Sequence, residues 1–243
     1  MSNIKNVEAL EVLQSDCSGF RGYNPGSPNL TIQSLANRVT NTKQAVDDAN
    51  VAKSSLDKES NDREMAFDGL PKLASSIVFT LVASGASAQT LNDARFILRQ
   101  LTGRKRKASK PVPSVEAAAP KDAAGEQVKI SRTPQASYAS KADHFGNLVK
   151  LVSAEPTYSP NEPELSVPGL NEKLARIQQL NSSVIQARST WSNKKMARDK
   201  MLYADNSLVT TGRSVQKYVR AAYGFHSAEY HRIAKLIFTK PRP

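Results

Sequence analysis

Residues 23–35 read YNPGSPNLTIQSL, and residues 158–170 repeat the pattern as YSPNEPELSVPGL. At an offset of 135 positions the two stretches share a tyrosine, two prolines, a leucine, a hydroxyl residue, a β-branched residue and a second leucine. Chance agreement at that many positions is improbable. The sequence therefore predicts an internal duplication, which has to be recognised before any single helix is assigned.

Each copy is predicted to be a proline-fixed arm that leads into a long helix. The prolines fix φ and bias the residue before them away from helical geometry, and Thr31 and Ser166 are suitable N-caps. Beyond the arms no proline or glycine occurs until Gly69 and Gly212, which allows helices of about 35 residues. Apolar residues spaced by three and four then form a narrow seam typical of coiled coils: Ile32, Leu35, Val39, Val46, Ala49 and Leu56 in the first copy, and Leu174, Ile177, Leu180, Val184, Ala187 and Trp191 in the second.

Shorter helices are expected after each long one. The Gly69-Leu70-Pro71 sequence predicts the end of the first long helix, and Asp205-Asn206 predicts the end of the second. The following helices are predicted at 73–84, 91–101, 208–223 and 228–238, with Gly85 and Gly224 as C-terminal glycines. The fold class is predicted to be all-α. Since a two-helix unit with a thin stripe cannot cover its own apolar face, the two copies are expected to pack together as an internally duplicated antiparallel helical bundle with four main helices and two short terminal helices.

Composition divides the chain into five segments. The middle one is rich in alanine, proline and charge and poor in large apolar residues, which is typical of a flexible linker. The predicted segments are an N-terminal arm at 1–30, helical repeat 1 at 31–103, a flexible basic linker at 104–142, an extended arm at 143–170, and helical repeat 2 at 171–243, packed with repeat 1.

The positive charge is unevenly distributed. The 243 residues carry a formal net charge of +12, of which residues 1–103 contribute −1, residues 104–142 contribute +6 and residues 143–243 contribute +7. Such asymmetry suggests an acidic partner, nucleic acid or another polyanion. The competing interpretation is a solvated, solubilising surface. The candidate polyanion-binding residues are Arg104, Lys105, Arg106, Lys107, Lys194, Lys195, Arg198, Arg213, Lys217 and Arg220.

Few residues are suited to catalysis. The single cysteine, Cys17, excludes intrachain disulfides and multi-cysteine metal sites. His226 and His231 are five residues apart and would lie on different faces of a helix. Phosphate-binding glycine motifs and the Gly-x-Ser-x-Gly serine motif are absent from the sequence. We therefore expect no enzymatic activity, no catalytic or metal-ligating residue and no cofactor.

The sequence predicts a cytoplasmic location, because it lacks the patterns of secreted and membrane-spanning proteins. Its first residues do not show the charge and apolar pattern of a secretory signal, and one cysteine fits a reducing compartment. An uninterrupted stretch of 18 apolar residues does not occur, so a membrane span is not expected. These features predict a cytoplasmic protein.

Arg63 and Arg198 stand at the same offset of 135, each followed by an acidic residue, Glu64 and Asp199. One interpretation is structural, with each arginine ion-paired or packed through its methylene stem. The other is functional, with the two guanidinium groups forming a pair of equivalent anion contacts.

The duplicated arm, the long helix, the segment from Tyr218 to Tyr230 and the closing Lys240-Pro241 resemble a family of uncharacterised bacterial all-helical proteins. The resemblance covers most of the chain apart from the linker. It implies the helical fold and a bacterial setting, and it implies no activity and no catalytic residue.

Two function classes follow from the sequence. The first is a non-enzymatic helical scaffold or interaction protein with a protein partner. The alternative is an accessory nucleic-acid or polyanion binder that uses the basic linker and the second repeat.

Overall fold

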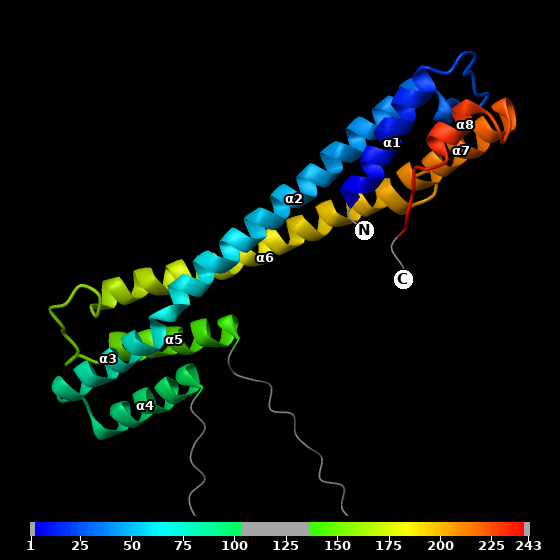
Figure 1. Cartoon of the computed structure of the whole chain (residues 1–243). Coiled ribbons are helices and arrows are strands. Elements are labelled where there is room, and N and C mark those ends of the chain that lie inside the picture. Colours follow the sequence, from blue (N-terminus) through cyan, green and yellow to red (C-terminus); the bar gives the residue numbers. More distant parts are fainter. Residues whose placement is uncertain (1–2, 104–136, 241–243) are drawn as a thin grey trace, which may run out of the picture. The chain divides into compact units, whose positions relative to one another are not determined.

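A computed structural model describes residues 3–103 and 137–240 (Figure 1). All regular secondary structure in these residues is helical, which confirms the all-α class. The predicted linker lies largely at 104–136, outside the described residues. The elements are α1 (Asn3–Ser18), the 3-10 helix η1 (Pro28–Leu30), α2 (Ile32–Asp68), α3 (Leu70–Ala83), α4 (Ala88–Thr102), α5 (Tyr138–Ser153), α6 (Val167–Tyr203), α7 (Leu208–Tyr223) and α8 (Ala228–Ile233).

The two long helices have the predicted extent. α2 and α6 contain 37 residues each. α2 ends directly before Gly69, and Pro71 lies in the first turn of α3, where a missing N–H costs no helical hydrogen bond. After α6 the chain turns at Asn206, whose φ of 55° is a left-handed conformation that asparagine tolerates better than most residues.

The two arms carry the same tyrosine hydrogen bond. The Tyr23 hydroxyl donates to the carbonyl of Leu30 at 2.7 Å, and the Tyr158 hydroxyl donates to the carbonyl of Leu165 at 2.8 Å. Each bond spans seven residues and closes the arm into a compact loop. The two loops therefore deliver the chain to α2 and to α6 in the same way.

Both predicted N-caps are confirmed. The Thr31 hydroxyl accepts a hydrogen bond from the backbone N–H of Ser34 at 3.3 Å, and the Ser166 hydroxyl accepts one from Gly169 at the same distance. Each bond satisfies one of the N–H groups that have no partner inside the helix.

The arms predicted at 1–30 and 143–170 are wrong in part, because 3–18 and 138–153 are helical. α5 also takes up residues 138–142 of the predicted linker. Each helix buries one apolar face at the spacing of a helix, and the two faces match at the offset of 135: Val7, Leu10, Leu13 and Cys17 in α1, and Ala142, Phe145, Leu148 and Val152 in α5.

The chain forms two compact units, and each takes residues from both halves. Unit 1 consists of residues 1–60 and 183–243, and unit 2 consists of residues 61–182. In unit 1, α1 packs against α7 and α8; in unit 2, α5 packs against α3 and α4 (Figure 1). This arrangement differs from the predicted single bundle of four main helices and from a division into repeats 31–103 and 171–243. The reason is that the apolar face of α1 is covered by helices from the second half.

The C-terminal segment is tied to α1 and α7 by side-chain amides and a guanidinium group. α8 ends at Ile233, earlier than the predicted residue 238. The Asn6 amide donates to the carbonyl of Thr239 at 2.9 Å and accepts from its N–H at 3.1 Å. Arg213 donates to the carbonyl of Phe238 at 2.6 Å, and the Phe238 ring lies over Gly212. Residues 236–240 are therefore held against α1 and α7 without regular secondary structure.

Among the described residues, one helical stretch is long and apolar enough to cross a membrane by length and composition, and it runs over residues 32–83. Its most apolar part is α3, where Leu70, Ala74 and Ile77 are fully buried in the core of unit 2. One such helix is weak evidence for a span, and 33% of its most apolar window is buried inside the protein. The absence of a membrane span stays a prediction.

Candidate functional site

The predicted polyanion-binding residues fall into three groups. Arg104, Lys105, Arg106 and Lys107 lie outside the described residues. The cations of α6 and those of α7 both belong to unit 1.

Several α6 cations make contacts with other side chains of the protein. Lys194 forms an ion pair with Asp48 of α2 at 2.7 Å, and Arg198 forms one with Asp199 at 2.7 Å. The Lys195 ammonium lies 5.4 Å from the centre of the Trp191 ring, within cation–π range. Only part of the charge predicted on this helix is therefore free to meet a polyanion.

The α7 cations also divide. Arg213 bonds to the carbonyl of Phe238, so its role is to hold the C-terminal segment. Arg220 lies 5.0 Å from the centre of the exposed Phe225 ring, and Lys217 is exposed on the same helix. Lys217 and Arg220 remain as surface cations of the predicted stripe.

Arg63 and Arg198 do not share one kind of contact. The Arg63 guanidinium lies 4.0 Å from the centre of the Tyr138 ring at the start of α5. Arg198 instead pairs with Asp199. Both contacts fit the structural interpretation, in which the arginine packs or pairs at the end of a long helix.

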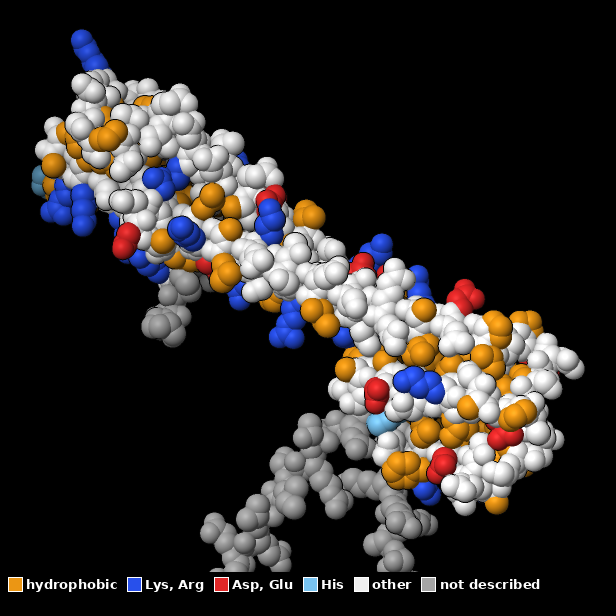
Figure 2. All heavy atoms as spheres, turned by 180° about the vertical axis from the view of Figure 1, so that it is seen from behind, with side chains coloured by type: hydrophobic (Ala, Val, Ile, Leu, Met, Phe, Trp, Pro, Cys, Tyr) orange, Lys and Arg blue, Asp and Glu red, His pale blue; other side chains and the backbone are white. Residues whose placement is uncertain are grey.

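The charge of the folded parts is concentrated in unit 1. Its described residues carry 17 basic and 10 acidic side chains, whereas those of unit 2 carry 8 and 9. Figure 2 shows basic side chains repeatedly along unit 1 and fewer of them over unit 2. The two units therefore offer surfaces of different chemistry.

Unit 2 exposes large apolar side chains. Phe79 of α3 is 74% exposed and Phe96 of α4 is 53% exposed, and Val82 and Met65 are exposed as well. In Figure 2 hydrophobic side chains gather over unit 2 between a few charged ones. Unit 1 exposes large apolar side chains as well, such as Val51, Ile185 and Phe225. The two exposed phenylalanines of unit 2 stand on α3 and α4, which pack against each other, and exposed aromatic residues on neighbouring helices are a candidate interaction surface.

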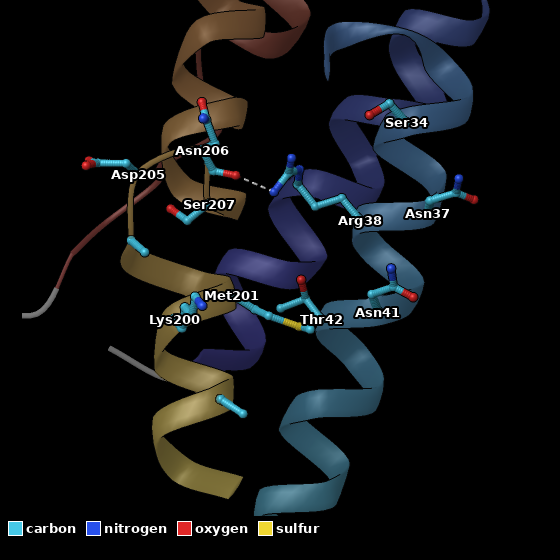
Figure 3. A pocket seen from close by; sticks show the side chains of 12 residues that line it. Ser34, Asn37, Arg38, Asn41, Thr42, Lys200, Met201, Asp205, Asn206 and Ser207 are labelled. Carbon is cyan, nitrogen blue, oxygen red and sulfur yellow. Dashed lines mark hydrogen bonds between the residues drawn. The ribbon is translucent and has the colours of Figure 1, made fainter. Parts of the chain in front are cut away.

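A pocket of about 530 Å³ opens in unit 1 between α2 and the end of α6. Its walls are mainly amides, hydroxyls and two cations (Figure 3). The lining residues are Ser34, Asn37, Arg38, Asn41, Thr42, Ala197, Lys200, Met201, Ala204, Asp205, Asn206 and Ser207.

Arg38 is the central cation of this pocket. Its Nη1 donates to the carbonyl of Asn206, the residue in the left-handed turn (Figure 3). Its Nε is buried and has no hydrogen-bond partner. Burial lowers the pKa of Arg38, because a desolvated guanidinium is less favourable than a hydrated one. An anion in the pocket would compensate this charge.

Thr42 places a buried hydroxyl beside Arg38. The residue is 1% exposed, and its Oγ1 has no hydrogen-bond partner. A buried hydroxyl without a partner costs free energy, so such groups are rare in folded proteins. At the offset of 135 the matching residue is Ile177, which is fully buried in unit 2. The hydroxyl is therefore not needed to build this position of the fold.

The N-terminus of α7 begins at the same pocket. Its N-cap residue, Ser207, makes no side-chain capping hydrogen bond. The N-caps of α4, α5 and α8, Ser87, Ser137 and Ser227, each accept a hydrogen bond from the third residue that follows. The first N–H groups of α7 thus add partial positive charge near Arg38 and Lys200.

The buried thiol of Cys17 is not suited to nucleophilic chemistry. Burial raises the pKa of Cys17 to about 12, and the neighbouring Asp16 charge contributes in the same direction. A thiol in this state is protonated at neutral pH and poorly reactive. Within the described ranges, no group of three or more His, Cys, Asp or Glu side chains is arranged to hold a metal ion.

We predict that burial of Tyr158 makes the folded protein less stable at alkaline pH. Burial raises the pKa of Tyr158 from 10.0 to about 12, so the folded state keeps a proton that the unfolded state releases. Its contribution is complete below pH 10 and is lost as the pH rises through 10 to 12. We expect the unfolding free energy in urea to fall less steeply between pH 9 and 11 for Tyr158→Phe than for the wild type. Equal slopes would contradict this assignment.

Comparison with protein-family models, curated proteins and solved structures finds no match for this chain. The resemblance to a bacterial helical family therefore stays a prediction. The pocket was not among the predicted sites, because it depends on the juxtaposition of α2 with the turn after α6. One signal for it was present in the sequence, namely a threonine in the first copy where the second copy has isoleucine.

Proposed function

We propose that the protein is a non-enzymatic, internally duplicated helical scaffold that binds a protein partner in the bacterial cytoplasm. The observation that carries this proposal is the exposure of Phe79 and Phe96 on α3 and α4 of unit 2. Aromatic residues and methionine are enriched at protein interfaces, where they bury large area at small entropic cost. The partner is expected to present an apolar, weakly charged surface.

The matching parts of the two halves support the duplication within this proposal. The arms have the same tyrosine bonds and the same N-caps. α1 and α5 bury equivalent apolar faces. The two units are built from corresponding helices of the two copies. Each unit can therefore carry a different surface on a similar framework. The described residues of unit 2 are nearly neutral, with 8 basic and 9 acidic side chains, whereas those of unit 1 carry a net positive charge.

Paired affinity capture tests the scaffold function. The wild type and a Phe79→Ser/Phe96→Ser variant serve as baits in extract from cells that naturally express the protein, and retained proteins are quantified by mass spectrometry. We expect at least one protein to be depleted tenfold or more by the variant and then to bind purified wild type in a titration. Because both residues are exposed, the variant should keep the wild-type circular dichroism and melting temperature.

Two results would contradict the proposal. One is a set of retained proteins that the double variant leaves unchanged. The other is binding of wild type, but not of the variant, to neutral lipid vesicles in a sedimentation assay, since the exposed aromatic residues would then serve a membrane surface.

A second candidate function, polyanion binding, is favoured by the excess of basic side chains in unit 1. We expect a Lys195→Gln/Lys217→Gln/Arg220→Gln variant to bind duplex DNA more weakly and with a flatter salt dependence. With fewer phosphate contacts, binding releases fewer counterions. A matched variant of unit 2, Lys72→Gln/Arg95→Gln/Lys150→Gln, is the control. An equal effect of both variants, or no wild-type binding at low salt, would exclude a site on unit 1.

A further inference from the structure

We propose that the pocket between α2 and the end of α6 binds the phosphate group of a small polar molecule. Four donors of different origin belong to residues that line the pocket: the guanidinium of Arg38, the ammonium of Lys200, the hydroxyl of Thr42 and the N-terminus of α7, which Ser207 does not cap. Phosphate oxygens accept charge-assisted hydrogen bonds from all of these groups.

Two buried polar atoms without a hydrogen-bond partner support a ligand in this pocket. The Nε of Arg38 and the Oγ1 of Thr42 are both buried without a hydrogen-bond partner, and both residues line the pocket. An acceptor between α2 and the turn after α6 would satisfy both groups, whereas a cation would be repelled by the guanidinium and would leave its Nε–H without a partner, although the hydroxyl itself can also accept. The sign of the ligand follows from this chemistry.

Met201 lines the pocket together with Thr42. In Figure 3 the Met201 side chain extends from α6 toward Thr42, and Met201 is itself 41% exposed. A thioether side chain has three rotatable bonds and changes rotamer at low cost. Since Thr42 is 1% exposed, the proposal requires a rotamer change of this kind to bring a ligand to the hydroxyl.

The acidic residue of the pocket does not oppose an anion directly. In Figure 3 the Asp205 carboxylate points away from Arg38 and from the space between the helices. The remaining wall is formed by the amides of Asn37 and Asn41 and the hydroxyl of Ser34. These groups suit hydroxyl or carbonyl groups on the rest of a ligand, and a volume of about 530 Å³ admits a molecule of metabolite size.

The second copy of the repeat keeps a cation, Lys173, at the position of Arg38 but lacks the polar groups around it. At the offset of 135 the positions of Ser34, Asn37 and Thr42 are occupied by Gly169, Glu172 and Ile177. A glutamate and an isoleucine replace an amide and a hydroxyl there, so the arrangement of donors is particular to unit 1. It is not a by-product of the duplicated fold.

Inorganic phosphate is the probe for the first measurement. The melting temperature of the full chain is followed by differential scanning fluorimetry in increasing sodium phosphate, against sodium chloride of the same ionic strength. We expect a saturable rise of several degrees in phosphate beyond that in chloride, since a ligand that binds only the folded state stabilises it. A rise of equal size in both salts would overturn the proposal.

Two variants locate the effect. Thr42→Val keeps the shape and charge of the protein and removes the hydroxyl, and Lys200→Gln removes an exposed cation. We expect Thr42→Val to melt higher than wild type without phosphate, because an unsatisfied buried hydroxyl is lost, and both variants to lose most of the phosphate-dependent shift. The control is Lys173→Gln, at the position in the second copy that matches Arg38; it should keep the shift. A shift of wild-type size in either pocket variant would overturn the proposal.

Discussion

Replacing Phe145 with alanine is expected to produce the largest loss of stability of any single substitution considered for this protein. Phe145 is fully buried in the core of unit 2, on the face of α5 that packs against α3 and α4. Truncation of a buried phenylalanine to alanine typically costs about 3–5 kcal/mol, because apolar contacts are lost and a cavity remains. We expect the urea midpoint of the affected transition, followed by circular dichroism, to fall accordingly.

Phe79→Ala is the matched control for this substitution. It removes the same atoms from unit 2, but the Phe79 side chain is mostly exposed, so the free energy of unfolding should change by about 0.5 kcal/mol or less. Similar losses for the two variants would contradict the packing of α5 described for unit 2.

The second large effect is expected for Gly212→Ala. Gly212 lies inside α7, where alanine would ordinarily stabilise the helix by about 1 kcal/mol relative to glycine. A Cβ at this position would come within 2.5 Å of the Phe238 ring, which is buried. The ring has to move, and overpacking of this kind typically costs about 1–3 kcal/mol. We expect a lower melting temperature despite the gain in helix propensity.

Gly69→Ala serves as the control, because a Cβ there meets no atom within 4 Å and φ is negative. It should leave the melting temperature unchanged or raise it slightly. A Gly212→Ala variant at least as stable as the wild type would show that Phe238 and the C-terminal segment do not pack on α7 as described.

Local signals in the sequence were sufficient for the arms and the long helices. Proline and glycine positions, with hydroxyl residues at the N-caps, predicted where α2 and α6 begin and end. These features depend on residues that are close in the chain. The same reasoning placed the turn at Asp205-Asn206 correctly.

The helices α1 and α5 were missed although their apolar spacing is visible in the sequence. Leu10 and Phe145 stand at the same offset as the arms, and both are fully buried. Extending the comparison upstream of Tyr23 and Tyr158 would have identified both helices. Their packing could not have been predicted in this way, because each covers helices from the other half of the chain.

The candidate sites show the same limit. Charge counting found the basic character that the structure places in unit 1, but it did not predict that Arg213 holds a backbone carbonyl or that Arg198 pairs with its neighbour. The pocket between α2 and α6 joins segments that are more than 150 residues apart in sequence, as the hydrogen bond from Arg38 to Asn206 shows. Such contacts follow from the tertiary fold and not from a local motif.

The central structural claim is that each compact unit is built from both halves of the chain. The most direct test is a full-length protein with a protease site inserted between residues 103 and 137, cleaved after folding and analysed by size-exclusion chromatography with light scattering. We predict that the two fragments stay together as one species with the mass of the intact chain and unchanged helicity, since α1 packs on α7 and α8, and α5 packs on α3 and α4. Separation into two independently folded fragments at micromolar concentration would contradict the account.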